Sequence, residues 1–182
     1  FSGPGEAMRA GIGMVHQHFM LVPVFTVAEN VALGDEHTRA LGVLDLEATR
    51  RRIREISAQY GFDVDPDAVV EDLPVGVQQR VEIIKALVRD ARILILDEPT
   101  AGMGPEERWR MIERVHALWQ ARRMTLVFIE HDMDIVFKIA QTVRVLRYGA
   151  VLAQGTPEEV RRDPAVVEAY LGAEHALEAA AP

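Results

Sequence analysis

Two adjacent carboxylates, Asp97 and Glu98, follow the most apolar predicted strand of the chain, residues 92–96. In open α/β sheets, ligands bind at the carboxyl ends of the strands. Because an isolated buried carboxylate is very costly, a pair of acids at such a place indicates a cation or a reacting water. We therefore predict that Asp97 holds Mg²⁺, directly or through water, and that Glu98 polarises an attacking water as a general base. Two acids that simply cap a strand at the surface would give the same pattern.

The strand at residues 92–96 belongs to a predicted strand–helix–strand unit. Residues 125–129 form a second apolar run, and such continuous runs suit parallel strands in a sheet covered on both faces. Between the two runs, Pro105 is well placed to begin a helix that continues to Arg122. The expected apolar stripe of this helix recurs at three- and four-residue spacing: Trp109, Ile112, His116 and Trp119. Such units connect through a right-handed crossover, so the pattern predicts an α/β fold.

The other predicted elements are mostly helical. Residues 46–60 are strongly helical, with Gly61 as the expected C-cap, and Ile53, Ile56 and Tyr60 on one face. Further helices are predicted at residues 77–89 and 135–140, and a hairpin from the strands 143–146 and 150–153. We interpret residues 21–88 as a helical subdomain inserted into an α/β core.

The composition excludes several classes of function. The chain has 182 residues, 49% of them hydrophobic and 26% charged, which fits one globular domain, or a core with a small subdomain, and excludes disorder. A net charge of −8 argues against nucleic-acid binding, which requires a basic face. The absence of cysteine excludes disulfides, zinc–thiolate sites and cysteine nucleophiles. No apolar run approaches the ~20 residues of a spanning helix, so we expect any membrane role to depend on a partner.

Residues 93–102, ILILDEPTAG, resemble the Walker B motif and the following D-loop of ABC ATPases. The resemblance implies a P-loop NTPase-like ABC ATPase fold, a parallel-sheet core with an inserted helical subdomain. The resemblance implies that Asp97 binds Mg²⁺ and that Glu98 is the catalytic base. His131 lies 33 positions after Glu98, after the next strand, and matches the family's switch histidine. Gly102 and Gly104 then belong to the D-loop at the nucleotide site. Gly104 stands where the family usually has Asn or Asp, so a side-chain contact across the ATPase dimer is lost.

Residues 11–19, GIGMVHQHF, resemble the Q-loop strand of the same family. Gln17 is then the residue expected to meet both Mg²⁺ and the attacking water. His16 and His18 share a strand face and offer a metal site of their own as an alternative, although no cluster of carboxylates accompanies them. The apolar residues 19–25 are either core or the border of the groove that receives a coupling helix of the membrane subunit.

Residues 73–81, LPVGVQQRV, occupy the place of the family signature, usually Leu-Ser-Gly-Gly-Gln. A glycine turn and a helix N-terminus aim N–H groups and a positive dipole at a phosphate. Gly76 and Gln78 are the expected nucleotide contacts, whereas Pro74 brings neither a hydroxyl nor an N–H. In the family this ATP is bound by the opposing subunit, so the motif implies a second ATPase subunit, identical or different. Without its context, the segment would be an ordinary turn before an amphipathic helix.

The phosphate-binding loop Gly-x-x-x-x-Gly-Lys-Ser/Thr does not occur in these 182 residues. In relatives it lies upstream of the point where this sequence begins. We therefore expect the chain to be the C-terminal two-thirds of an ABC ATPase, truncated at the N-terminus. Without the loop, affinity for ATP and catalysis should collapse.

The resemblance divides the chain into four parts. Residues 1–20 are a remnant of the α/β core with the Q-loop, and residues 21–88 are the helical subdomain with the signature. Residues 89–172 complete the core with the Walker B motif, D-loop and switch histidine, and residues 173–182 form a flexible tail. The signature form Leu-Pro-Val-Gly resembles nucleoside and simple-sugar importers, whereas residues 129–172 resemble branched-chain amino-acid and urea importers, and this segment favours the amino-acid branch.

Three functions fit these observations. The first is an importer ATPase that hydrolyses ATP with Mg²⁺, works with transmembrane permease subunits, and lies peripherally on the cytoplasmic face of the plasma membrane. The second is a non-catalytic ABC-like interaction module that has lost its nucleotide site. The third is a non-transport ABC ATPase of DNA repair or translation, for which the acidic charge and the short helical subdomain are unfavourable. An upstream phosphate-binding loop would eliminate the second.

Overall fold

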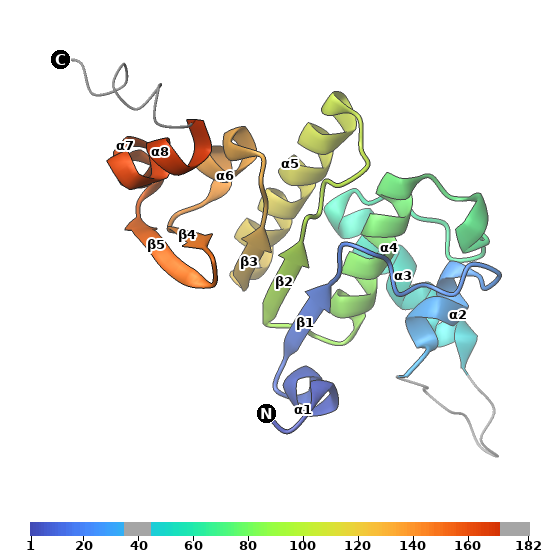
Figure 1. The fold of residues 1–182 in the computed structure, drawn as a ribbon. Coiled ribbons are helices and arrows are strands. Elements are labelled where there is room, and N and C mark those ends of the chain that lie inside the picture. The colour runs from blue at the N-terminus through green and yellow to red at the C-terminus, as the bar shows by residue number, and fades with distance from the viewer. Residues whose placement is uncertain (35–44, 172–182) are drawn as a thin grey trace. The chain divides into compact units, whose positions relative to one another are not determined.

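The computed structural model describes residues 1–34 and 45–171. The chain forms two compact units, Phe1–Glu130 and His131–Pro182 (Figure 1). The division of the chain into four functional parts rests on its motifs and stays a prediction. Its tail, residues 173–182, lies outside the described residues. Among the helices that the structure describes, none is both long enough and apolar enough to cross a membrane.

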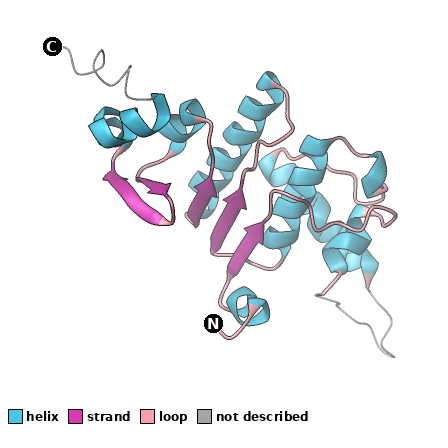
Figure 2. Ribbon diagram, in the orientation of Figure 1, coloured by secondary structure: helices cyan, strands magenta, loops and turns pink. Residues whose placement is uncertain are grey.

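The first unit contains a parallel sheet of β1 (Ile12–Val15), β2 (Ile93–Asp97) and β3 (Thr125–Ile129), in that order (Figure 2). Helix α5 (Pro105–Arg122) connects β2 to β3, which confirms the predicted strand–helix–strand unit. Since β1 and β3 both pair with β2, the segments that follow the three strands start from the same edge of the sheet. The acid pair and the Q-loop segment both start there.

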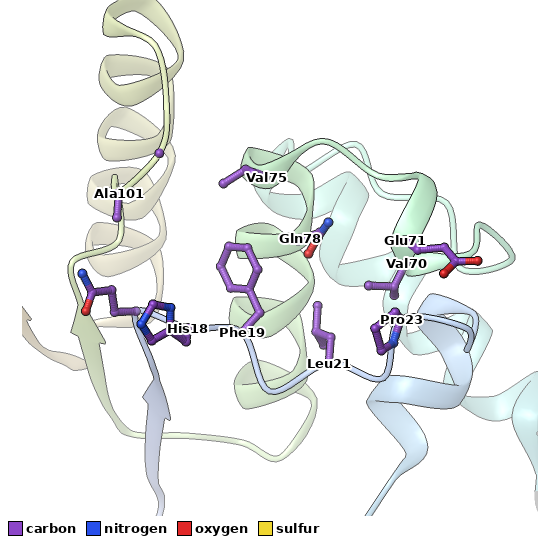
Figure 3. Close-up of a pocket in the computed structure, with 11 residues that line it drawn as sticks. His18, Phe19, Leu21, Pro23, Val70, Glu71, Val75, Gln78 and Ala101 are labelled. Carbon is purple, nitrogen blue, oxygen red and sulfur yellow. The ribbon is translucent and has the colours of Figure 1, made fainter.

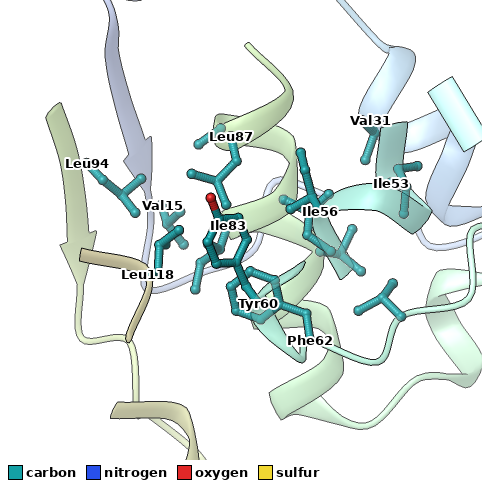
Figure 4. Close-up of a cluster of buried hydrophobic side chains, with 14 of the residues drawn as sticks. Val15, Val31, Ile53, Ile56, Tyr60, Phe62, Ile83, Leu87, Leu94 and Leu118 are labelled. Carbon is teal, nitrogen blue, oxygen red and sulfur yellow. The ribbon is translucent and has the colours of Figure 1, made fainter. Parts of the chain in front are cut away.

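The two faces of this sheet differ. Val15, Leu94 and Leu96 are fully buried on one face and join the main core with α4 and α5 (Figure 4). On the other face, Met14, Val127 and Ile129 are 43%, 45% and 52% exposed in the described chain. The prediction of a sheet covered on both faces is therefore wrong for the described residues. A continuous apolar run shows that both faces are apolar, but it does not show that a layer is present to cover each of them.

Helix α5 has the predicted bounds but a different buried face. Its fully buried side chains are Met111, Ile112, Val115 and Leu118. Of the predicted stripe, only Ile112 is among them, and the rings of His116 and Trp119 stack 5.4 Å apart at the half-buried margin. Aliphatic side chains leave no polar atom unsatisfied in the core, whereas an imidazole or indole N–H requires a partner.

The helical part of the first unit comprises α1 (Pro4–Arg9), α2 (Val27–Ala32), α3 (Leu46–Tyr60), a 3₁₀ turn (Val70–Asp72) and α4 (Val75–Val88). Helix α3 has the predicted bounds, and it buries the predicted face and ends at Gly61, whose φ is 65°. Helix α4 begins two residues before the predicted start, with Pro74 at its N-cap. The structure adds α1 and α2, and a capping box formed by Thr26 and Glu29 begins α2.

The second unit contains α6 (Met133–Ile139), the antiparallel pair β4 (Val143–Arg147) and β5 (Ala150–Gly155), α7 (Pro157–Arg162) and α8 (Pro164–Leu171). The hairpin and the helix before it confirm the predicted elements to within two residues. A second capping box, Thr156 with Glu159, begins α7. There the backbone N–H of Thr156 and its side-chain hydroxyl hold the pKa of the Glu159 carboxyl below its ordinary value, because they stabilise its charged form.

Candidate nucleotide site

Glu98 begins the turn that follows β2, and its backbone is unusual. Asp97 is the last residue of the strand, and Glu98 adopts a left-handed conformation with φ 46°. Its N–H donates to the carbonyl of Ile129 at the end of β3, at 2.9 Å. A left-handed conformation costs a residue with a Cβ about 1 kcal/mol or more, and residues held in this way cluster at functional sites.

The side chains of Gln17 and Glu98 meet at the carboxyl edge of the sheet. Gln17 Nε2 donates to Glu98 Oε2 at 2.6 Å, although the residues are 81 positions apart. The contact follows from topology, because Gln17 lies two residues beyond β1 and Glu98 one residue beyond the adjacent strand β2. Two residues with predicted catalytic roles are thus in direct contact.

Asp97 and Gln17 have the donor atoms that suit Mg²⁺ bound together with a nucleotide. The bond to Glu98 uses the amide nitrogen of Gln17, and its oxygen is the donor type that Mg²⁺ takes. Mg²⁺ is typically held by one or two carboxylates and by substrate phosphates, and less often by a cage of protein ligands. The described residues, His16 and His18 among them, contain no group of three or more His, Cys, Asp or Glu side chains that could hold a metal. The residues at the sheet edge thus fit the cation that accompanies a nucleotide.

A hollow of about 480 Å³ lies beside this contact in the first unit (Figure 3). It brings together three predicted site residues from the Q-loop, the signature and the D-loop: Gln17, Gln78 and Gly102. Phe19, Leu21, Pro23 and Val75 give it an apolar wall. Of the apolar residues 19–25, Leu21 also packs against the core, whereas Met20 and Val24 are each 67% exposed.

The signature segment is held tightly at its helix start. Gln78 Nε2 donates to the carbonyl of Leu73 at 2.8 Å, so the amide closes the turn before α4. Arg80 donates to the carbonyls of Gly76 and Phe62, at 3.0 and 2.7 Å, and burial lowers the pKa of its guanidinium. The contacts of Gly76 and Gln78 with a nucleotide stay predictions.

A side chain at Gly76 would meet the carboxyl end of Glu107. A Cβ there would overlap Glu107 Oε1 and lie 2.7 Å from Glu107 Cδ, atoms at the flexible end of that side chain. We expect Gly76→Ala to change the free energy of unfolding by less than about 1 kcal/mol, because the displacement of Glu107 opposes the gain of about 0.5–1 kcal/mol from replacing a helical glycine. Urea denaturation of the single and double variants measures this. In a Glu107→Ala background, Gly76→Ala should raise the free energy of unfolding by about 0.5–1 kcal/mol, and an equal change in both backgrounds would show that Glu107 is not the obstacle.

The remaining predicted residues occupy separate places. Gly104 is the N-cap residue of α5. Because glycine has no side chain, this position lacks both the expected D-loop side chain and a side-chain hydrogen bond that caps the helix. His131 begins the second unit, directly before Asp132, whose carboxylate caps α6 by accepting from the N–H groups of Asp134 and Ile135. The catalytic role of His131 stays a prediction.

The structure also reveals a pair that the sequence analysis did not single out. Thr100, in the turn after Glu98, donates its hydroxyl to Glu130 Oε1 at 2.7 Å and its N–H to the same oxygen at 3.3 Å. The only signal in the sequence is that both residues follow adjacent strands, as Gln17 and Glu98 do.

Comparison with known families settles what these motifs belong to. The sequence model described as ABC transporter matches residues 4–101, more than half of the chain. The chain belongs to the ABC transporter family. A second model, described as branched-chain amino acid ATP-binding cassette transporter, matches residues 150–176.

Curated relatives of this ABC transporter chain are import ATP-binding proteins. The chain is 45% identical over 146 residues to the nucleoside import ATP-binding protein NupA of Lactococcus lactis subsp. cremoris, covering 80% of this chain and 28% of the relative. It is 43% identical over 160 residues to the ribose import ATP-binding protein RbsA 3 of Rubrobacter xylanophilus, covering 88% and 32%. The chain thus spans about a third of the length of these relatives.

Solved structures confirm the predicted ABC ATPase fold. The ADP conformation of MJ1267, an ATP-binding cassette of an ABC transporter, is 26% identical with a TM-score of 0.78, over 94% of this chain and 72% of that one. The cbiO1 protein of Clostridium perfringens, part of the ABC transporter complex cbiONQ, is 29% identical with a TM-score of 0.68, over 93% and 68%.

Proposed function

We propose that this chain is part of the ATP-hydrolysing subunit of an ABC importer, which couples ATP hydrolysis to solute uptake. The observation that carries the proposal is the hydrogen bond between Gln17 and Glu98, at 2.6 Å. It joins the two side chains that an attacking water would need: a carboxylate to take its proton and an amide to orient it. The import ATP-binding proteins among the relatives support the direction of transport.

In this mechanism Glu98 polarises the water, and Gln17 holds both Glu98 and the water in place. Asp97 and the oxygen of Gln17 would hold Mg²⁺, which would neutralise charge on the phosphates. Gly76 and the start of α4 would face the phosphate of a nucleotide bound by a second ATPase subunit, and His131 is the proposed switch histidine. These residue roles are proposals that go beyond the family assignment.

The solute is proposed to be a nucleoside or a simple sugar. Relatives named for nucleoside, ribose and glucose import are 39–45% identical over 80–88% of the chain. The alternative, a branched-chain amino acid, is supported by a match that covers residues 150–176 alone. Because these matches cover most of the chain, they are the stronger guide, and the amino-acid branch favoured by the C-terminal segment becomes the less supported alternative.

The proposed partners are transmembrane permease subunits and a second ATPase subunit. A permease partner would place the chain peripherally on the cytoplasmic face of the plasma membrane. The acidic net charge of −8 supports the expectation that nucleic acid is not a partner.

Calorimetry with MgATP tests the proposal on two proteins. The first is this chain, which has no Gly-x-x-x-x-Gly-Lys-Ser/Thr loop in its 182 residues. The second, called the joined protein, carries before Phe1 a segment from an ABC import ATP-binding protein that contains this loop. We expect MgATP to bind the joined protein at least about 100-fold more tightly, because backbone N–H groups and a lysine around the phosphates dominate affinity. If the joined protein folds and binds no nucleotide, the proposal fails and an interaction-only role replaces it.

A further inference from the structure

The turn that carries Glu98 is attached to the end of the neighbouring strand at two points. The N–H of Glu98 donates to the carbonyl of Ile129 at 2.9 Å, which extends the ladder between β2 and β3 by one bond. Two residues further on, Thr100 donates both its hydroxyl and its N–H to Glu130 Oε1, at 2.7 and 3.3 Å. All four residues belong to the first unit.

The second attachment is where the turn needs support. Glu98 has a φ of 46°, a conformation that a residue with a Cβ keeps only when its surroundings impose it. The ladder bond fixes the N-terminal side of Glu98. On the other side, the Ala101 N–H donates to the carbonyl of Glu98 at 3.0 Å and closes the turn, while the bonds of Thr100 to Glu130 attach the turn to the segment after β3.

Thr100 is the residue through which the turn is held. It is only 5% exposed, so both its hydroxyl and its N–H require partners inside the protein. A carboxylate is the stronger acceptor for such donors, because charge-assisted hydrogen bonds are roughly twice as strong as neutral ones. Glu130 supplies one oxygen to both donors, and this oxygen fixes the backbone and the side chain of Thr100 together.

We infer that Glu130 is a positioning residue for Glu98: through Thr100 it holds the left-handed turn that aims the Glu98 carboxylate at its water. The inference rests on the proposed function, because it gives Glu98 the role of base. It also assigns a task to a residue that the motifs leave without one, directly before His131 in the chain. Glu130 itself touches neither the nucleotide nor the water in this scheme.

Two substitutions at Glu130 separate positioning from charge. Both hydrogen bonds end on Oε1, so the carbonyl oxygen of Gln can accept them, whereas Ala can accept neither. In the joined protein we expect Glu130→Gln to keep kcat within about threefold of the parent. Glu130→Ala should lower kcat about 30-fold with KM within about twofold, because a misplaced base slows chemistry without weakening binding.

Thr100 supplies a second test from the other end of the contact. Thr100→Val removes the hydroxyl donor and keeps the N–H, so we expect kcat to fall about fivefold. The double variant Thr100→Val/Glu130→Ala should be no slower than Glu130→Ala alone, because both changes remove one contact. Glu113→Ala, at an exposed acid of α5, is the matched control and should leave kcat unchanged.

The outcomes distinguish the inference from the function on which it rests. If the joined protein hydrolyses no ATP, the proposed function fails and the inference fails with it. If it hydrolyses ATP and Glu130→Ala keeps the parental kcat, or Glu130→Gln is as slow as Glu130→Ala, the inference alone is overturned. Should Glu130→Ala fail to fold, an unchanged kcat in Thr100→Val overturns it equally.

Discussion

Glu98→Gln is expected to lower ATP turnover by the joined protein about 1,000-fold, which lies within the range that general-base catalysis contributes. The amide keeps the shape of the side chain. Its oxygen can still accept the hydrogen bond that Gln17 Nε2 donates to Glu98 in the parent protein, at 2.6 Å. It cannot take a proton from water. MgATP should therefore bind within about threefold of the parent affinity, because the substitution removes an interaction needed only in the transition state.

Steady-state turnover, calorimetry and gel filtration in MgATP together measure this result. Because ATP is bound and not hydrolysed, the variant should elute as an ATP-bound dimer, whereas the parent returns to monomer as ATP is consumed. Glu106→Gln, at an exposed acid in the first turn of α5, serves as the matched control and should behave as the parent does. A turnover within tenfold of the parent in Glu98→Gln would show that Glu98 is not the base.

The elements that could be predicted from sequence are those whose own residues determine them. Helix α3 has a clear apolar face and a glycine at its end, and the strands β2 and β3 are continuous apolar runs. Helices α1 and α2 have six residues each, too few for a periodic pattern to stand out. Helix α2 is buried through packing against α3 and α4, which a local pattern does not contain.

The candidate site was predictable where topology alone brings residues together. Gln17 and Glu98 follow adjacent parallel strands, so their meeting follows from the order of the strands. The pairing of Thr100 with Glu130 depends on the path of a turn after its strand has ended, and no periodicity describes such a path. The bond from Gln78 to Leu73 is a similar case, because an amide near a helix start has several possible partners.

Asn30→Ala is expected to lower the free energy of unfolding by about 3 kcal/mol, since it leaves buried polar groups without partners. Asn30 lies in α2 and is fully buried. Its Oδ1 accepts from the N–H of Val22 at 2.7 Å, and its Nδ2 donates to the carbonyls of Val22 and Thr26, at 3.0 and 3.1 Å. The side chain thus ties the backbone of Val22 to the start of α2.

Urea denaturation of three variants tests whether these bonds or the volume of the side chain account for the loss. Asn30→Asp keeps an acceptor for Val22 N–H but turns a carboxylate toward the carbonyl oxygens, so it should cost at least as much as Asn30→Ala. Gln120→Ala, at an exposed amide of α5, should change stability by less than about 0.5 kcal/mol. If Asn30→Asp were as stable as the parent, the carbonyl oxygens would not be accepting from Nδ2. The amide of Asn30 would then not be what fixes the path of the chain between Gln17 and α2.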